Sequence, residues 1–326
     1  CISVKCEYPN PLVFQRADPF IYRHTDGYYY FTASVPEYDR IEIRRARTLA
    51  ELDQATPFVA WRHHAEGPMS HLNWAPEIHY LRGKGYIYFA AAPNDEVTGI
   101  TFNHRMFVLE NSNADPLTDA WVEKGQLKTG LETFSLDATA FEYQDKLYYV
   151  WAQEDRTVCK DSHSNLYIAE MENPWTLKTK PVLLSKPEYD WETKIFWVNE
   201  GPAVLIKNGH VFLTYSASAT DENYCMGMLV AKDGADLLNP ATWQKLSHPV
   251  FTTSYENHIY GPGHSCFTVA EDGKTDLLIY HARNYTEITG DPLYDPNRHT
   301  RVQVIRWQAD GMPDFGTPLP EARSMD

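Results

Sequence analysis

The chain has 326 residues and a formal net charge of −15 at pH 7, from 29 basic and 44 acidic side chains. It carries no basic block, which argues against binding to nucleic-acid phosphates or to an anionic membrane surface. No apolar run approaches the roughly 20 residues that a membrane-spanning helix needs. Hydrophobic residues make up 43% of the chain and aromatic residues 13%, which suffices for a sizeable core. These properties predict an acidic globular protein with a neutral or polar partner, and with no nucleic-acid or membrane partner.

A repeated pattern runs through the whole sequence. Five times, a buried-looking strand with one polar residue is followed by a turn and then by an aromatic strand. The polar residues of successive units are 59, 60, 63 and 64 positions apart. The five polar-bearing strands are expected at 16–23, 73–81, 136–143, 199–206 and 261–269.

Each of these strands has two expected partners in the same unit. Turn signals such as Asp26-Gly27 and Asn208-Gly209 supply the positive φ that tight hairpins need. The second strands are expected at 28–34, 86–92, 147–153, 211–218 and 277–283. The third strands are expected at 41–47, 105–111, 165–171, 226–232 and 301–307. A weaker fourth strand is expected near Trp61, Trp121 and Trp243, and short helical turns near 48–54 and 234–241.

Five units of four antiparallel strands with a period near 60 residues predict an all-β, five-bladed β-propeller. Residues 1–326 are expected to form this single domain, with only a short tail after Pro313. A pair of β-sandwiches is the structural alternative, but it does not account for five equal units.

The first strand of each blade borders the central channel of a propeller, so its polar residue is expected to point into a shared funnel. A carboxylate buried in a strand is costly unless it is paired or functional. Each of these residues also has a structural reading. These readings are a turn opener at Asp18, a loop residue at Glu77, a hydrogen-bonded core carboxylate at Asp137, a strand-edge residue at Glu200 and a core histidine at His264.

Several carboxylates in one funnel suit the hydrolysis of glycosides. One acid protonates the leaving oxygen, and one base deprotonates a water on the opposite face of the sugar. A third, ionised carboxylate raises the pKa of the acid by like-charge repulsion. Aromatic residues around the funnel suit the C–H faces of a neutral sugar.

The ordered motifs ADPF, WAPE, LDAT, NEGP and GPGH resemble glycoside hydrolase family 43 over essentially the whole chain. The stretches 26–46 and 67–80 look most like the α-L-arabinofuranosidase branch of that family. The resemblance implies a five-bladed propeller that acts with inversion. It also implies a substrate that is an arabinose-containing oligo- or polysaccharide such as arabinan or arabinoxylan.

The resemblance also implies roles for individual residues. Asp18 matches the general base, Asp137 the carboxylate that raises the pKa of the acid and orients it, and Glu200 the general acid. His264 matches a channel histidine that lies near a bound calcium ion in many members. That ion would be structural, so no cofactor is required for the chemistry. Substrate-binding roles are implied for Phe31, Trp74 and Arg283. The alternatives are inter-blade packing for Phe31 and Trp74, and a surface ion pair for Arg283.

The leading hypothesis is an inverting exo-acting α-L-arabinofuranosidase. A β-xylosidase, or an enzyme with both activities, is the nearest alternative, and an endo-arabinanase is disfavoured. A non-catalytic propeller that binds protein or sugar has no need for carboxylates on three first strands. The absence of a signal segment leads to the expectation of a cytoplasmic enzyme, with a secreted enzyme whose signal has been removed as the alternative. The sequence leaves the oligomeric state open.

Overall fold

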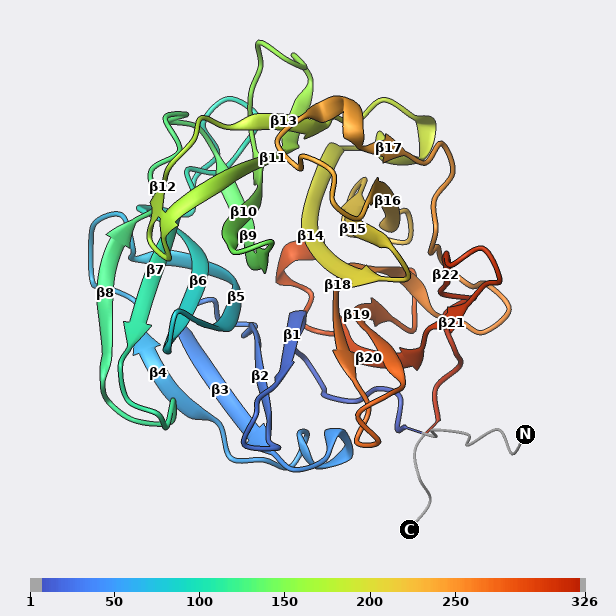
Figure 1. Cartoon of the computed structure of the whole chain (residues 1–326), viewed down its shortest axis with the longest axis horizontal. Helices are drawn as coiled ribbons and strands as arrows, with labels where there is room; N and C mark the ends of the chain where they lie inside the picture. Colours follow the sequence, from blue (N-terminus) through green and yellow to red (C-terminus); the bar gives the residue numbers. More distant parts are fainter. Residues whose placement is uncertain (1–7, 323–326) are drawn as a thin grey trace.

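The computed structural model describes residues 8–322, which fold almost entirely as β-strands. The first strand group is a four-stranded antiparallel sheet made of β1 (Ala17–Arg23), β2 (Tyr29–Ser34), β3 (Arg40–Ala46) and β4 (Phe58–Arg62). The second group repeats this order with β5 (His71–Leu81), β6 (Lys84–Ala92), β7 (Arg105–Asn111) and β8 (Trp121–Gln126). Figure 1 shows the two groups side by side.

The third and fourth groups are joined into one nine-stranded sheet. The third group consists of β9 (Ser135–Tyr143), β10 (Lys146–Gln153), β11 (Ser162–Asn173), β12 (Thr176–Leu177) and β13 (Val182–Ser185). The fourth consists of β14 (Trp197–Lys207), β15 (His210–Ala217), β16 (Cys225–Lys232) and β17 (Gln244–Lys245). The join is a short parallel pairing of β11 with β14, whereas the pairs within each group are antiparallel.

The fifth group has three strands, β18 (Tyr260–Val269), β19 (Asp276–Arg283) and β20 (His299–Val304), and is followed by the two-stranded pair β21 (Arg306–Trp307) and β22 (Pro313–Asp314). The N-terminal segment joins this group, because Val13 forms an antiparallel bridge with Thr300 of β20. The helical content of the described chain is limited to 3₁₀ turns. These turns are η1 (Leu49–Glu51), η2 (Asp190–Glu192), η3 (Pro240–Thr242) and η4 (Pro292–Tyr294).

The expected first, second and third strands are all present in the structure, with ends that differ by a few residues. The fourth strands expected near three tryptophans are present. Trp61 lies in β4 and Trp121 in β8, and Trp243 directly precedes the two-residue β17. The fifth group departs from the four-strand expectation, since β21 and β22 form a separate sheet. The helical turns expected near 48–54 and 234–241 are the single turns η1 and η3.

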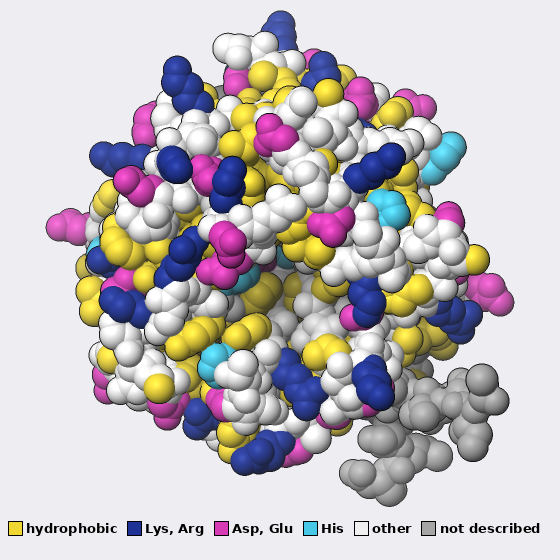
Figure 2. Space-filling model, in the orientation of Figure 1, with side chains coloured by type: hydrophobic (Ala, Val, Ile, Leu, Met, Phe, Trp, Pro, Cys, Tyr) yellow, Lys and Arg dark blue, Asp and Glu magenta, His cyan; other side chains and the backbone are white. Residues whose placement is uncertain are grey.

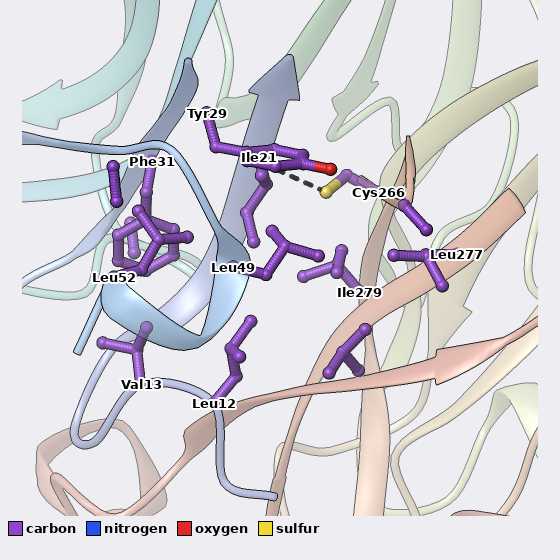
Figure 3. Packing of buried hydrophobic residues seen from close by; sticks show 14 residues of the cluster. Leu12, Val13, Ile21, Tyr29, Phe31, Leu49, Leu52, Cys266, Leu277 and Ile279 are labelled. Carbon is purple, nitrogen blue, oxygen red and sulfur yellow. Dashed lines mark hydrogen bonds between the residues drawn. The ribbon is translucent and has the colours of Figure 1, made fainter. Parts of the chain in front are cut away.

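Hydrophobic clusters fill the spaces between neighbouring strand groups. Separate clusters join the first group to the second, the second to the third, the third to the fourth and the fourth to the fifth. A further cluster joins the fifth group back to the first, with Ile21 and Phe31 packed near Cys266 and Ile279 (Figure 3). Burial of these side chains, at about 25 cal/mol per Å² of apolar surface, is the main force that holds the groups together.

The first strand of every group is interrupted by a β-bulge. The ladder register shifts near the start of β1, β5, β9, β14 and β18. In each of these strands one residue at a shift has a left-handed backbone, with φ between 48° and 59°. These residues are Asp18, Ala75, Asp137, Gly201 and His264. Because a bulge bends its strand and redirects side chains, the same irregularity acts five times at the same end of the first strands.

The face drawn in Figure 2 is hollowed near its centre, and acidic and basic side chains are intermixed around it. No basic patch dominates that face. Within residues 8–322, no helix has the length and apolar character that a membrane crossing requires.

A glycine in β16 tests the packing of the fourth group. Gly227 faces Tyr215, and a Cβ at this position would overlap the Tyr215 ring and lie 2.7 Å from Trp191 Cη2. We expect Gly227→Ala to lower the free energy of unfolding by about 1–3 kcal/mol, as overpacked cores do. The control is Gly85→Ala in β6, whose Cβ would meet Trp121 at an ordinary 3.4 Å. Equal denaturant midpoints for the two variants would contradict this packing.

Candidate active site

A cavity with about 360 Å³ of free space opens where the first strands of the groups meet. Its lining residues are Asp18, Tyr38, Trp74, Leu136, Asp137, Glu200, Thr220, Tyr224, His264, Leu293 and Arg298. The structure therefore brings together the three predicted catalytic carboxylates, His264 and Trp74.

The bulges explain how separate strands deliver these side chains to one point. Asp18, Asp137 and His264 are themselves the left-handed residues of β1, β9 and β18. In β14 the left-handed residue is Gly201, the neighbour of Glu200. Glycine is favoured there because it adopts positive φ freely. A Cβ on Gly201 would also come within 3.2 Å of His264.

Both carboxylate oxygens of Asp18 have polar partners. Oδ1 lies 3.0 Å from Nδ1 of His264, and Oδ2 accepts a hydrogen bond from the Ser34 hydroxyl at 2.5 Å. Arg298 Nη1 lies 4.0 Å from Oδ1. Burial alone would raise the pKa of Asp18, but its ion pair and hydrogen bond with His264, together with the Arg298 charge, hold that pKa well below the usual range. Asp18 is therefore ionised at any working pH.

His264 is a second cation of the cavity, beside Arg298. Its Nδ1 also lies 3.8 Å from Asp137 Oδ2. Burial disfavours the charged imidazole, but the nearby Asp18 and Asp137 carboxylates outweigh it and raise the pKa of His264 to about 10. The ring is therefore protonated at neutral pH and compensates one of the carboxylate charges.

The other two carboxyl groups of the cavity belong to Asp137 and Glu200. Asp137 Oδ2 accepts the Gly201 N–H at 3.0 Å, and Glu200 Oε1 accepts the Tyr224 hydroxyl at 3.2 Å. Burial raises the pKa of Asp137 to about 6 despite the His264 charge. Burial and the Asp137 charge raise the pKa of Glu200 to about 8. At pH 7 the cavity therefore holds ionised Asp137 beside protonated Glu200.

Trp74 forms part of the cavity wall, as predicted. Its indole stacks on the His104 ring at 3.8 Å and is only 9% exposed. Its Nε1–H has no partner among residues 8–322. A buried donor without a partner is uncommon in folded proteins.

The substrate-contact roles predicted for Phe31 and Arg283 do not match their positions. Phe31 is 2% exposed and packs in the cluster between the first and fifth groups, because its place in β2 turns it into that interface (Figure 3). Arg283 also lies outside the cavity lining. Its guanidinium donates to Asp295 Oδ1 at 3.2 Å and to the carbonyls of Pro292 and Thr220. It therefore braces the two loops that carry Thr220 and Leu293 to the cavity.

Glu77 does not reach the cavity either. It lies two residues beyond Ala75, the left-handed residue of β5, and pairs with His79 Nε2 at 2.8 Å. Its position relative to the bulge therefore differs from the positions of Asp18, Asp137, Glu200 and His264. Glu77 lies within β5 and not in a loop, which was its structural reading from the sequence.

The sequence analysis missed Arg298, Tyr224, Tyr38 and the loop residues Thr220 and Leu293. Arg298 directly precedes β20, and Tyr224 precedes β16, so neither belongs to the repeated first-strand pattern. Tyr38 and Leu293 are joined by a hydrogen bond from the Tyr38 hydroxyl to the Leu293 carbonyl. No spacing in the sequence identifies these residues, because long loops of different lengths bring them to the cavity.

The surroundings of His264 are a poor match for a calcium cage. Calcium prefers six to eight oxygen ligands, whereas Nδ1 of His264 is already paired with Asp18. Within the described residues, no group of three or more His, Cys, Asp and Glu side chains could hold a metal ion. Protein side chains alone therefore do not supply the coordination, and no catalytic step is derived through a metal.

Several known proteins are similar to this chain over most of its length. The model of glycosyl hydrolases family 43 matches residues 8–313. A Streptomyces avermitilis protein named extracellular exo-alpha-(1->5)-L-arabinofuranosidase is 55% identical over 319 residues, covering 98% of this chain and 65% of that protein. A Humicola insolens protein named alpha-L-arabinofuranosidase 43 is 52% identical with the same coverage. The chain thus spans 65% of the length of these two relatives.

A solved structure is similar over almost its full length. The crystal structure of alpha-L-arabinofuranosidase from Lactobacillus brevis has a TM-score of 0.96 and 62% sequence identity, covering 97% of this chain and 98% of that one. Because the family model matches most of the chain and these relatives exceed 50% identity, this chain belongs to glycosyl hydrolases family 43.

Proposed function

We propose that the protein is an inverting exo-acting α-L-arabinofuranosidase, which releases terminal arabinofuranose from arabinan, arabino-oligosaccharides or arabinoxylan. The observation that carries the proposal is that the pKa values of two carboxyl groups in the cavity are shifted in opposite directions. Asp18 has a lowered pKa and Glu200 a raised pKa, although both are half-buried carboxyl groups of the same cavity. Two carboxyl groups whose environments drive their pKa values apart are the usual base and acid of a glycosidase. The names of the relatives above support arabinofuranose as the sugar.

In this proposal Asp18 is the general base and Glu200 the general acid. Asp18 accepts a proton from a water as the water oxygen bonds to the anomeric carbon. The glycosidic C–O bond breaks, and Glu200 gives its proton to the departing oxygen. The products are inverted arabinofuranose and the shortened chain, with Asp18 protonated and Glu200 ionised. Exchange of protons with solvent restores both groups.

Asp137 and His264 set the charges for this reaction. Asp137 is ionised at neutral pH and its charge keeps Glu200 protonated. Protonated His264 holds Asp18 in its ionised form through the 3.0 Å ion pair. The Trp74 indole provides a wall for the sugar.

For the architecture, we propose a single-domain five-bladed β-propeller in which each strand group is a blade. Its support is the cyclic order of the hydrophobic clusters, since the fifth group packs on the first as each other group packs on the next. The bridge from Val13 to Thr300 provides the missing outer pairing of the fifth blade. A structural cation near His264, held through water, remains a prediction.

The expectation of a cytoplasmic enzyme finds no support in the comparisons. Two Streptomyces relatives, each 55% identical, are named extracellular enzymes. We therefore propose the alternative weighed from the sequence, a protein that acts outside the cell on polymeric or partly degraded arabinan.

The substrate and the stereochemistry can be tested together. We expect hydrolysis of 4-nitrophenyl α-L-arabinofuranoside to exceed that of the β-D-xyloside at equal concentration. With arabino-oligosaccharides, proton NMR in the first minutes should show β-L-arabinofuranose before mutarotation, because the water attacks opposite the leaving group. Initial release of the α anomer would contradict inversion, and faster cleavage of the xyloside would favour the xylosidase alternative.

The pH profile tests the role of Asp137. Since Glu200 must be protonated to act and its raised pKa is about 8, kcat/KM should fall as the pH rises through about 8. Asp137→Asn removes the neighbouring charge and retains an oxygen for the Gly201 N–H. We expect this change to move the basic limb to lower pH. An unshifted limb would show that the Asp137 charge does not control the acid.

Substrates whose leaving groups differ in basicity distinguish the general acid from the general base. Glu200→Ala should lose about 10²–10⁴-fold in kcat on arabino-oligosaccharides, the usual range for one proton-transfer group. The loss should be far smaller on a nitrophenyl arabinofuranoside, whose phenolate leaves without a proton. Asp18→Ala should impair both substrates alike, because each needs an activated water.

The matched control for these variants is Glu110→Gln. Glu110 lies on β7 outside the cavity and accepts a hydrogen bond from Tyr86. It should leave both rates close to those of the parent enzyme. If Glu200→Ala lost the same factor on both substrates, Glu200 could not be the general acid.

A further inference from the structure

The bulges of the first strands create a hydrogen-bonding requirement. A bulged residue is left outside the regular ladder, and a buried backbone N–H without a partner is costly. Four of the left-handed residues donate this N–H to a side chain of the preceding strand group, counting the fifth group as preceding the first. These pairs are Ala75 to Ser34 Oγ at 2.8 Å, Gly201 to Asp137 Oδ2 at 3.0 Å, His264 to Ser216 Oγ at 2.7 Å and Asp18 to His281 Nδ1 at 2.9 Å.

The acceptor for Asp18 is the only ring among these four. His281 lies in β19, between β18 and β20, and is 1% exposed. Since Nδ1 accepts the Asp18 N–H, the imidazole proton must be on Nε2. Burial and the nearby Arg298 charge lower the pKa of His281 well below its usual value, despite the opposing charge of Asp18. The ring therefore stays neutral and keeps the Nδ1 lone pair.

His281 contacts two residues that line the cavity, Asp18 and Tyr224. Its Nδ1 also lies 3.6 Å from Asp18 Oδ1, and its ring stacks on Tyr224 at 5.6 Å with an interplanar angle of 12°. Tyr224 in turn donates to Glu200. Within residues 8–322, Nε2 of His281 has no hydrogen-bond partner. The bond from Asp18 is thus the hydrogen bond that fixes the orientation of this ring.

We propose that His281 is a positioning residue for Asp18: its neutral Nδ1 holds the backbone of Asp18 in the left-handed bulge and thereby aims the carboxylate at the attacking water. This inference rests on the proposed function, in which Asp18 is the general base. In this proposal the position of the general base depends on the contact between the fifth and the first strand groups.

Asp18 needs this support because its backbone is left-handed, with a φ of 55°. An aspartate in the left-handed region returns readily to an extended conformation unless its surroundings prevent this. Without an acceptor at the position of Nδ1, the N–H loses its partner and the bulge relaxes. A displacement of about 1 Å at a catalytic group can cost on the order of 100-fold in rate.

Two substitutions separate the acceptor from the ring. His281→Asn retains an oxygen close to the position of Nδ1 but removes the ring that stacks on Tyr224. His281→Phe retains the ring but has no acceptor. We expect His281→Phe to lose about 100-fold in kcat by the same factor on a nitrophenyl arabinofuranoside and on arabinotriose, with KM nearly unchanged. His281→Asn should stay within about tenfold of the parent on both substrates.

Circular dichroism and thermal unfolding establish that the variants fold. If His281→Phe does not fold, His281→Gln replaces it, because its longer side chain places the acceptor near Nε2 instead; the same loss is expected. A folded His281→Phe with parental activity would overturn the proposal, as would equal losses in His281→Phe and His281→Asn. A loss confined to arabinotriose would also overturn it, since the ring would then act through Tyr224 on Glu200.

These outcomes are distinct from failure of the proposed function. If the parent enzyme hydrolysed no arabinofuranoside, the function itself would be wrong. If the parent were active but Asp18→Ala retained its activity, Asp18 would not be the base. Only the comparison of the His281 variants with an active parent decides the positioning role.

Discussion

Three carboxyl groups and one imidazole line a single cavity, and the structure depends on how their charges are balanced. His264 is protonated because Asp18 and Asp137 surround it, and Asp18 is ionised because His264 is protonated. One carboxyl group must then remain neutral, since buried like charges repel strongly. Glu200 is this neutral group, because burial and the Asp137 charge both raise its pKa. An acid and a base thus arise from similar groups through their positions alone.

This balance requires the side chains to lie within a few ångströms of one another, and the five bulges achieve that. A regular strand alternates its side chains between two faces of the sheet, so it would direct few of them towards the centre. A left-handed residue at the start of each first strand turns the chain there instead. The strain of these conformations is supported by hydrogen bonds from neighbouring groups, such as the bond from Gly201 to Asp137. The same carboxylate therefore supports the backbone beside Glu200 and tunes the acidity of Glu200.

Loops complete the cavity that the strands begin. Arg283 ties together the loops of Thr220 and Pro292, and Tyr38 bonds to Leu293, next to Pro292 in the same loop. Arg298 reaches Asp18 from the loop before β20. These contacts join the fourth, fifth and first strand groups, so the shape of the cavity depends on the packing of the fifth group against the first. The cluster around Ile21 and Ile279 provides that packing.

The sequence by itself determined the strands and the carboxylates that the structure brings together in the cavity. Turn residues, aromatic strands and a period near 60 residues are local signals, and Asp18, Asp137, Glu200 and His264 occur at that period. It could not determine which side chains of the second strands and loops face the cavity. Phe31 and Arg283 were assigned to the sugar, but packing between groups placed one in the core and the other under the loops. Arg298, Tyr224 and His281 became part of the site only in the tertiary structure, because their neighbours are more than ten residues away in the sequence and their roles depend on distances that no local pattern encodes.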